Sequence, residues 1–200
     1  MNRAIVLVSG AAIAAVVGVS LSLTFNRGQD LASCFSTNAE GADIGGPFTL
    51  VNQDGQTVSD ANVITEPTLV YFGYGFCPDV CPIDNARNVA AVDLLAEQGV
   101  SVTPVFISVD PARDTPEFMA DYTANMHPKM IGLTGSEAQV KAAADAYKVY
   151  YARNGDDPDY YLVDHSAFTY LMLPDTGFAT FFRRDTPPQQ IAQEVSCALT

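Results

Sequence analysis

Two cysteines separated by three residues, Cys77 and Cys81, are the side chains of this chain best suited to chemistry. They follow an apolar, aromatic run that is typical of a buried strand, and they precede Pro82, a residue favoured in the first turn of a helix. We therefore expect Cys77 in a turn and Cys81 at a helix start. Unpaired N–H groups and the helix dipole favour a thiolate at such a position.

The pair has a redox or metal-binding interpretation and a structural one. A purely structural disulfide is common in secreted domains. The two neighbouring prolines and the junction between strand and helix argue against it, because a structural bridge usually closes a longer loop and gains more from doing so. We expect the thiols to act as nucleophiles or metal ligands.

The chain has two histidines, and one of them has neighbours that suit a metal ligand. His165 stands at a strand entrance beside Asp164 and Ser166, both of which are able to hydrogen-bond an imidazole and fix its tautomer. With the two thiolates it completes a set of two sulfur donors and one nitrogen donor. Such a set suits copper best, since thiolates select Cu(I), whereas structural zinc usually takes four protein ligands. His127 is expected to be exposed at a helix end.

The elements that position these side chains alternate between strands and helices. Residues 47–58 predict a β-hairpin, and the helix after Pro82 should bury the apolar face made by Ile83, Ala86, Ala90 and Leu94. A second buried strand over residues 100–109 leads into a helix that is capped by Thr115 and begins with Pro116. Between them, the charged side chains of Asp110, Arg113 and Asp114 are expected to hold the loop together rather than to catalyse.

The second half predicts another helix, a hairpin and a terminal helix. A helix should open at Ser136 and carry Val140, Ala144, Tyr147 and Tyr151 on one face. The acidic loop 154–159 is interpreted as solvated, residues 167–173 and 177–182 as a hairpin, and residues 187–199 as the last helix. Strand, helix, strand, helix, hairpin and helix, with a cysteine pair after a strand, is a thioredoxin-like α/β order.

The amino-terminal residues have the composition of a membrane anchor. Residues 4–25 contain no charge and are long enough, at about 1.5 Å per residue, to cross a hydrocarbon layer of roughly 30 Å. Arg3 precedes them, which leaves residues 1–3 in the cytoplasm and everything after Phe25 outside. A cleaved signal peptide is the alternative, but its apolar core is typically only about 7–15 residues. The polar residues 26–44 are predicted to be a tether, and residues 45–200 the folded domain.

The composition excludes some partners. The formal net charge is −13, with 10 basic and 23 acidic side chains, so binding to nucleic acid is not expected. The same charge permits steering toward a basic patch on a protein partner, which salt would weaken.

Three blocks of sequence carry a family resemblance. They are Y-F-G-Y-G-F-C-P-D-V-C-P (71–82), D-P-A-R-D-T-P (110–116) and Y-L-V-D-H-S (161–166), in this order behind one anchor. Together they resemble the Sco/SenC family of membrane-tethered, thioredoxin-like copper proteins. The resemblance implies a thioredoxin-like α/β fold with an N-terminal β-hairpin and an inserted β-hairpin, preceded by one transmembrane helix. Gly75 departs from the threonine that is common in the family.

The resemblance also implies a function. Cys77, Cys81 and His165 would bind one copper ion, Cu(I) or Cu(II), at an exposed rim and deliver it to the binuclear site of cytochrome c oxidase subunit II or to another copper chaperone. The alternative is a thiol-disulfide oxidoreductase in which Cys77 and Cys81 form the redox pair. The implied location is the cytoplasmic membrane, with the domain in the periplasm, where a bridge between Cys34 and Cys197 is expected.

Overall fold

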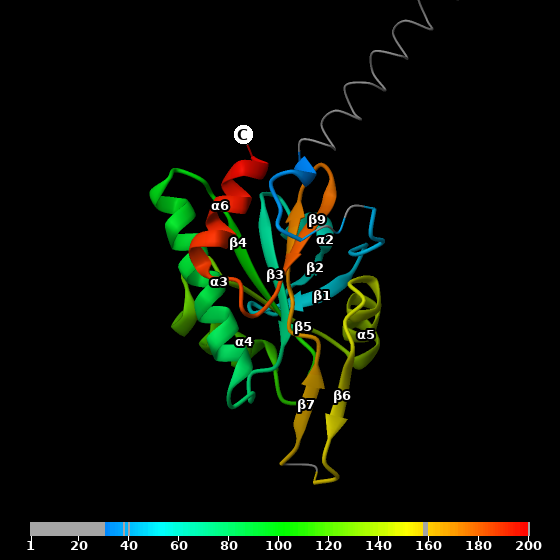
Figure 1. The fold of residues 1–200 in the computed structure, drawn as a ribbon. Coiled ribbons are helices and arrows are strands. Elements are labelled where there is room, and N and C mark those ends of the chain that lie inside the picture. The colour runs from blue at the N-terminus through cyan, green and yellow to red at the C-terminus, as the bar shows by residue number, and fades with distance from the viewer. Residues whose placement is uncertain (1–30, 38, 40, 158–159, 200) are drawn as a thin grey trace, which may run out of the picture.

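The computed structural model describes residues 31–37, 39, 41–157 and 160–199, in which helices pack on both sides of a mixed sheet (Figure 1). The strands are β1 (Thr49–Asn52), β2 (Thr57–Ser59), β3 (Thr68–Gly73), β4 (Thr103–Ser108), β5 (Ile131–Thr134), β6 (Tyr151–Asn154), β7 (Leu162–His165), β8 (Thr169–Leu173) and β9 (Gly177–Phe182). The helices are α2 (Asp60–Val63), α3 (Val80–Glu97), α4 (Pro116–Met126), α5 (Glu137–Ala146) and α6 (Pro188–Ala198).

The main sheet has seven strands in the order β2-β1-β5-β4-β3-β8-β9. Strands β3, β4 and β5 are parallel, as the helical crossovers between them require, and the remaining pairs are antiparallel. The predicted hairpins over residues 47–58 and 167–182 are confirmed as β1–β2 and β8–β9. This arrangement agrees with the predicted thioredoxin-like α/β order.

Strand β3 lies inside the sheet, and its side chains alternate between the two faces. Tyr71 points to α3, where its hydroxyl donates to Asp84. Phe72 points the other way, to Tyr147 just after α5, with ring centroids 5.2 Å apart. Figure 1 shows α3, α4 and α6 on one side of the sheet and α5 on the other. Because both faces are covered, every residue of β3 is buried.

The buried face of α3 is not the predicted one. Ile83 is 57% exposed, whereas the side chains that face inward include the polar Asp84, Asn85 and Asn88. Each of these polar groups has a partner that offsets its desolvation: Asn85 donates to Tyr122, and Asn88 accepts from Thr169. Apolar spacing therefore pointed to the wrong face, because the buried face carries polar residues in its first half and apolar ones only in its second, at Ala91, Val92 and Leu95.

The starts of α4 and α5 agree with the sequence. Thr115 accepts a hydrogen bond from the Phe118 N–H at 3.3 Å, and Ser136 caps α5 in the same way through Gln139. The end of α5 was predicted too late. The helix stops at Ala146, and Tyr151 instead begins β6.

Strands β6 and β7 form a separate two-stranded sheet, hereafter the His165 hairpin, that Figure 1 shows extending beyond the main sheet. Their register places Tyr151 opposite His165 and Asn154 opposite Leu162. It is the β-hairpin inserted between α5 and β8. Its first strand was not predicted, because Tyr151 continued the apolar spacing of the preceding helix.

The segment before the domain contacts it. Leu31 and Phe35 pack against the cluster between the main sheet, α3 and α6, and Cys34 forms the expected disulfide with Cys197 in α6. None of the helices formed by the described residues has the length and apolar character needed to cross a membrane. The predicted anchor, residues 4–25, lies outside the described residues.

Candidate metal centre

The two thiols lie at the junction between strand β3 and helix α3. Cys77 stands in the loop, and Cys81 is the second residue of a helix that begins at Val80, slightly earlier than predicted. Gly73, the last residue of β3, makes room for this approach. A Cβ atom there would lie 2.8 Å from Cys81 Sγ and 2.9 Å from the Phe106 ring, closer than side chains pack.

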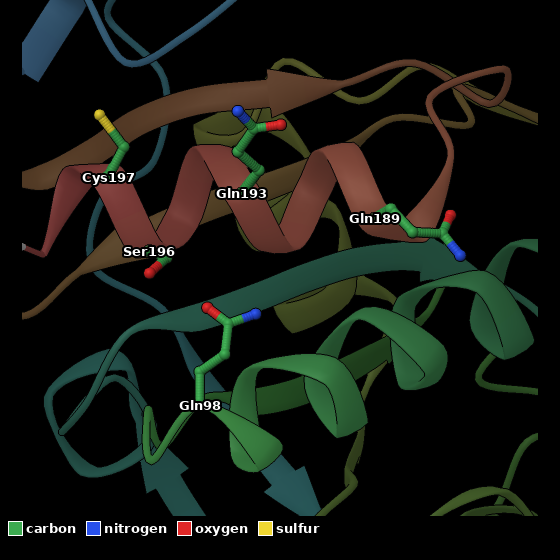
Figure 2. Close-up of a pocket in the computed structure, with 5 residues that line it drawn as sticks. All are labelled: Gln98, Gln189, Gln193, Ser196 and Cys197. Carbon is green, nitrogen blue, oxygen red and sulfur yellow. The ribbon is translucent and has the colours of Figure 1, made fainter.

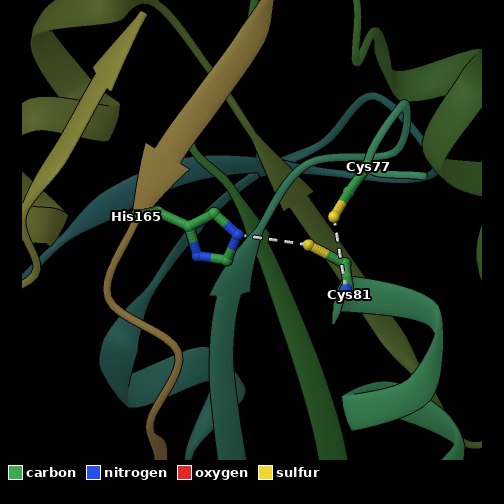
Figure 3. Close-up of side chains that lie close together, drawn as sticks. All are labelled: Cys77, Cys81 and His165. Atoms are coloured by element: carbon green, nitrogen blue, oxygen red, sulfur yellow. Dashed lines mark hydrogen bonds between the residues drawn. The ribbon is translucent and has the colours of Figure 1, made fainter. Parts of the chain in front are cut away.

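His165 comes to the same place from the end of β7 (Figure 3). Its Nε2 lies 3.3 Å from Cys81 Sγ, and the Cys81 N–H donates to Cys77 Sγ at 3.3 Å. The sulfur and ring-nitrogen atoms of the three residues all lie within 4.8 Å of one another. The predicted set of two sulfurs and one nitrogen is therefore brought together by segments that are 84 residues apart in the sequence.

The imidazole is oriented by the backbone. His165 Nδ1 lies 3.0 Å from the carbonyl oxygen of Ser166, which only accepts, so Nδ1 carries the proton and Nε2 presents its lone pair to the sulfurs. Asp164 was one of two predicted partners, but its carboxylate instead accepts from Asn154. Burial lowers the pKa of His165, against the raising effect of the Ser166 carbonyl, so the ring is neutral at pH 7.

The Cys81 thiol does not have the low pKa expected of a helix start. Burial raises its pKa well above the ordinary value and outweighs the lowering effect of the Tyr74 backbone. Cys81 is 1% exposed and Cys77 9%. The expected exposed rim is therefore wrong for the sulfurs, which lie below the surface, while His165 is half-buried.

An open hollow of about 310 Å³ gives access to two of the donor residues, Cys77 and His165. Its walls come from the cysteine loop and from the His165 hairpin, and it is lined by Tyr74, Cys77, Pro78, Asp79, Val80, Leu162, Val163, Asp164 and His165. The arrangement can hold one soft metal ion, or it can close a disulfide between the two cysteines. A partner group can approach Cys77 and His165 through this opening.

A second hollow of about 300 Å³ lies between the end of α3 and helix α6 (Figure 2). It is lined by Gln98, Gln189, Gln193, Ser196 and Cys197. The sulfur of Cys197 is in the disulfide, and amides and a hydroxyl make up the other polar groups. This hollow offers no metal-ligand set.

The other predicted residues have structural positions. Asp114 is fully buried, and its Oδ2 accepts from the Gly75 N–H at 2.9 Å and from the Ser108 hydroxyl, as expected of a residue that holds a loop. His127 is not exposed as predicted, since its side chain is 13% exposed and Nε2 lies 3.3 Å from Asp93 of α3. It takes no part in the site.

Sequence reasoning missed two residues beside the donors. Gly73 gives Cys81 its space, and Tyr71 lies edge-on to the His165 ring with centroids 6.2 Å apart. The signal available for Gly73 was a glycine inside an otherwise bulky strand, which often marks a close approach. A buried tyrosine in an aromatic strand gives no comparable signal.

Comparisons with known proteins agree with this geometry. A family model described as SCO1/SenC matches residues 36–200. Protein SenC of Rhodobacter capsulatus is 53% identical, and the match covers 99% of this chain and 91% of that protein.

Two solved structures extend the comparison to three dimensions. Arabidopsis thaliana ScoI with copper bound superposes with a TM-score of 0.75 at 42% identity, covering 78% of this chain and 98% of that one. BsSco, a member of the Sco family of cytochrome c oxidase assembly proteins in which a disulfide switch was identified, superposes with a TM-score of 0.64 at 27% identity, covering 80% and 96%.

Proposed function

This chain belongs to the SCO1/SenC family, and on that premise we propose that it is a copper chaperone that binds one copper ion through Cys77, Cys81 and His165. The observation that carries the proposal is the convergence of the three donor atoms within 4.8 Å of one another beside an open hollow. Copper is the cargo of this site rather than a resident cofactor. The copper-bound ScoI relative supports the choice of metal.

The donor chemistry gives each residue a role. The cysteines, once deprotonated, supply the soft sulfur donors that select Cu(I). His165 supplies a neutral nitrogen that is already oriented by Ser166. Three protein donors leave room on the copper ion for a ligand from the recipient. That ligand can enter through the hollow, so the copper ion can be released by stepwise ligand exchange.

We propose the binuclear copper site of cytochrome c oxidase subunit II as the recipient, reached directly or through another copper chaperone. The membership of BsSco in a family of oxidase assembly proteins supports this assignment. The net charge of −13 would steer the chain toward a basic surface on that partner.

Copper transfer tests the proposal. The full-length chain, loaded with one Cu(I) under anaerobic conditions, should lose its copper to the copper-free subunit II domain when the two are mixed and separated. A loaded Cys77→Ser protein should retain too little copper to transfer. Copper that stays on the wild-type chain at a large excess of the recipient would contradict delivery.

A thiol-disulfide oxidoreductase is the second candidate function, favoured by the close approach of the Cys81 N–H to Cys77 Sγ and by the disulfide switch of BsSco. In that reaction the two thiols form a disulfide, and two electrons and two protons pass to a disulfide of the partner, which becomes two thiols. Reduced protein without copper should then reduce an oxidised subunit II domain at a rate that Cys81→Ser abolishes. No reduction above the rate of free dithiothreitol at equal concentration would remove this candidate.

We further propose that residues 4–25 anchor the chain in the cytoplasmic membrane with the domain in the periplasm. The charge-free run and the preceding Arg3 support this orientation. Protease added to intact spheroplasts should digest the domain, and full protection there would contradict the orientation.

A further inference from the structure

His165 lies on a hairpin whose described residues form no strand pairs with the main sheet. Within the described part of the chain, β6 and β7 pair only with each other, whereas the cysteine loop continues from the central strand β3. The distance between His165 Nε2 and the sulfurs therefore depends on contacts that join the His165 hairpin to the body of the domain.

Arg113 holds the hairpin at Tyr161, the residue before β7. Its Nη1 donates to the Tyr161 carbonyl at 3.0 Å, and its guanidinium carbon lies 3.7 Å from the Tyr161 ring centroid. Its Nε donates to Asp110, whose other carboxylate oxygen accepts from the Tyr161 hydroxyl at 2.6 Å. Tyr161 is thus tied to the loop between β4 and α4 through its carbonyl, its ring and its hydroxyl.

The same guanidinium group contacts the cysteine loop. Its carbon lies 5.0 Å from the Phe76 ring centroid and 5.7 Å from that of Tyr74, the residues on either side of Gly75. Phe76 directly precedes Cys77. Arg113 is half-buried, with 16% of its side chain exposed, so these contacts are only partly weakened by solvent.

We propose that Arg113 is a positioning residue of the copper site. It joins the cysteine loop to the His165 hairpin and so holds His165 Nε2 close enough to the two sulfurs for all three atoms to bind one copper ion. The inference rests on the proposed function, because Arg113 would not bind copper itself and would act only by placing a copper ligand. A planar guanidinium is required: it stacks on rings and donates in two directions at once, which a lysine ammonium does not do with the same geometry.

A matched control lies on the same ring. Arg153 also stacks on Tyr161, with its guanidinium carbon 3.9 Å from the centroid, but it donates to Gly155 and Asp157 within its own hairpin. Among the described residues, Arg153 forms no hydrogen bond or ion pair with the cysteine loop or with Asp110. Arg153→Lys therefore removes a stacked guanidinium from Tyr161 and leaves the connection between the two ligand-bearing segments in place.

A double-mutant cycle tests the proposal. Cu(I) affinity is measured by anaerobic chelator competition on the full-length chain for the wild type, Arg113→Lys, His165→Ala, the double variant and Arg153→Lys. Arg113→Lys should lower the affinity on the order of tenfold, as loss of a group that orients a ligand does. The double variant should bind no more weakly than His165→Ala alone, because Arg113 acts through His165. Arg153→Lys should keep the wild-type affinity.

Several results would overturn the proposal. An Arg113→Lys protein with wild-type affinity would do so, and so would losses that add in the double variant. Thermal unfolding of each variant separates a folding defect from a site defect, because a purely structural role lowers the melting temperature without changing the affinity of the folded protein. Should Arg113→Lys fail to fold, Tyr161→Phe replaces it in the cycle, since it removes only the hydroxyl bond to Asp110. A wild-type chain that binds no copper would instead reject the proposed function.

Discussion

At the scale of single residues, burial sets the protonation states of two of the proposed metal ligands, Cys81 and His165. Burial raises the pKa of Cys81, so that thiol is protonated at pH 7 until a metal ion displaces its proton. Burial also lowers the pKa of His165, which leaves the imidazole free to act as a ligand. Copper binding and thiol-disulfide exchange both use the thiolate, so either reaction requires Cys81 to lose its proton first.

Asp114 below the cysteine loop should make stability depend on pH. Burial raises the pKa of its carboxyl group to about 6, against the lowering effect of the hydrogen bonds from Ser108 and Gly75, and its Oδ1 has no hydrogen-bond partner. A raised pKa means that the folded state binds the proton more tightly. The contribution of Asp114 protonation to stability is therefore fully present below its ordinary pKa of 3.8, and it is lost as the pH rises through about 6.

The comparison of wild type with Asp114→Asn isolates this effect from the other carboxylates. The difference between their free energies of unfolding should change by about 2 kcal/mol between pH 4 and pH 7, with the wild type relatively more stable at the lower pH. Urea unfolding at several pH values measures it. A difference that does not vary across this range would show that Asp114 has an ordinary pKa.

At the scale of the elements, α3 offers the sharpest contrast between pattern and structure. The apolar spacing placed Ile83 on the buried face, whereas Ile83 is 57% exposed and the polar Asn88 is 2% exposed. Asn88 Oδ1 accepts from Arg87 at 3.1 Å and from Thr169 at 3.0 Å, so the helix is tied to β8 by hydrogen bonds.

A pair of alanine substitutions tests which face of α3 carries the stability. Asn88→Ala should lower the free energy of unfolding by about 1–3 kcal/mol, because it leaves buried polar partners unsatisfied. Ile83→Ala should change it by less than about 0.5 kcal/mol, as exposed positions do. Urea denaturation of the two variants measures both changes in the free energy of unfolding. A larger loss in Ile83→Ala than in Asn88→Ala would show that the face predicted from apolar spacing carries the stability.

The elements that could be predicted are those with a local signal. The N-cap residues Thr115 and Ser136 predict the starts of α4 and α5, and turn residues predict the hairpins β1–β2 and β8–β9. Strand β6 could not be predicted, because Tyr151 fits a helical spacing and its partner strand lies beyond the acidic loop. The buried face of α3 depends on Tyr122 and Thr169, which are distant in sequence, so local periodicity contains no information about it.

At the scale of the whole molecule, the Cys34–Cys197 disulfide ties the start of the described chain to its last helix across 163 residues. Such a bridge limits the freedom of the unfolded chain, and removing one from a small secreted domain typically costs about 2–5 kcal/mol. Cys34→Ser and Cys197→Ser should therefore lower the melting temperature by similar amounts. Calorimetry under non-reducing conditions measures the shift, and two variants as stable as the wild type would contradict a stabilising role for the bridge.

The whole site shows where sequence reasoning succeeds and where it stops. Cys77, Cys81 and His165 could be selected by residue type and by a family resemblance, and the fold does bring them together. The connection through Arg113 could not be foreseen, because its partner Tyr161 lies 48 residues away and is joined by a backbone carbonyl and a ring. Those contacts exist only once the His165 hairpin packs on the domain.

The most direct test of the central claim is the Cu(I) stoichiometry and affinity of the full-length chain, measured by anaerobic chelator competition. We predict one copper per chain in the wild type. In His165→Ala the Cu(I) affinity should fall on the order of tenfold or more, because a direct ligand of the copper ion is removed. The other histidine provides the control: His127→Ala should bind as the wild type does, since His127 pairs with Asp93 outside the site. An unchanged affinity in His165→Ala would contradict the three-ligand copper site.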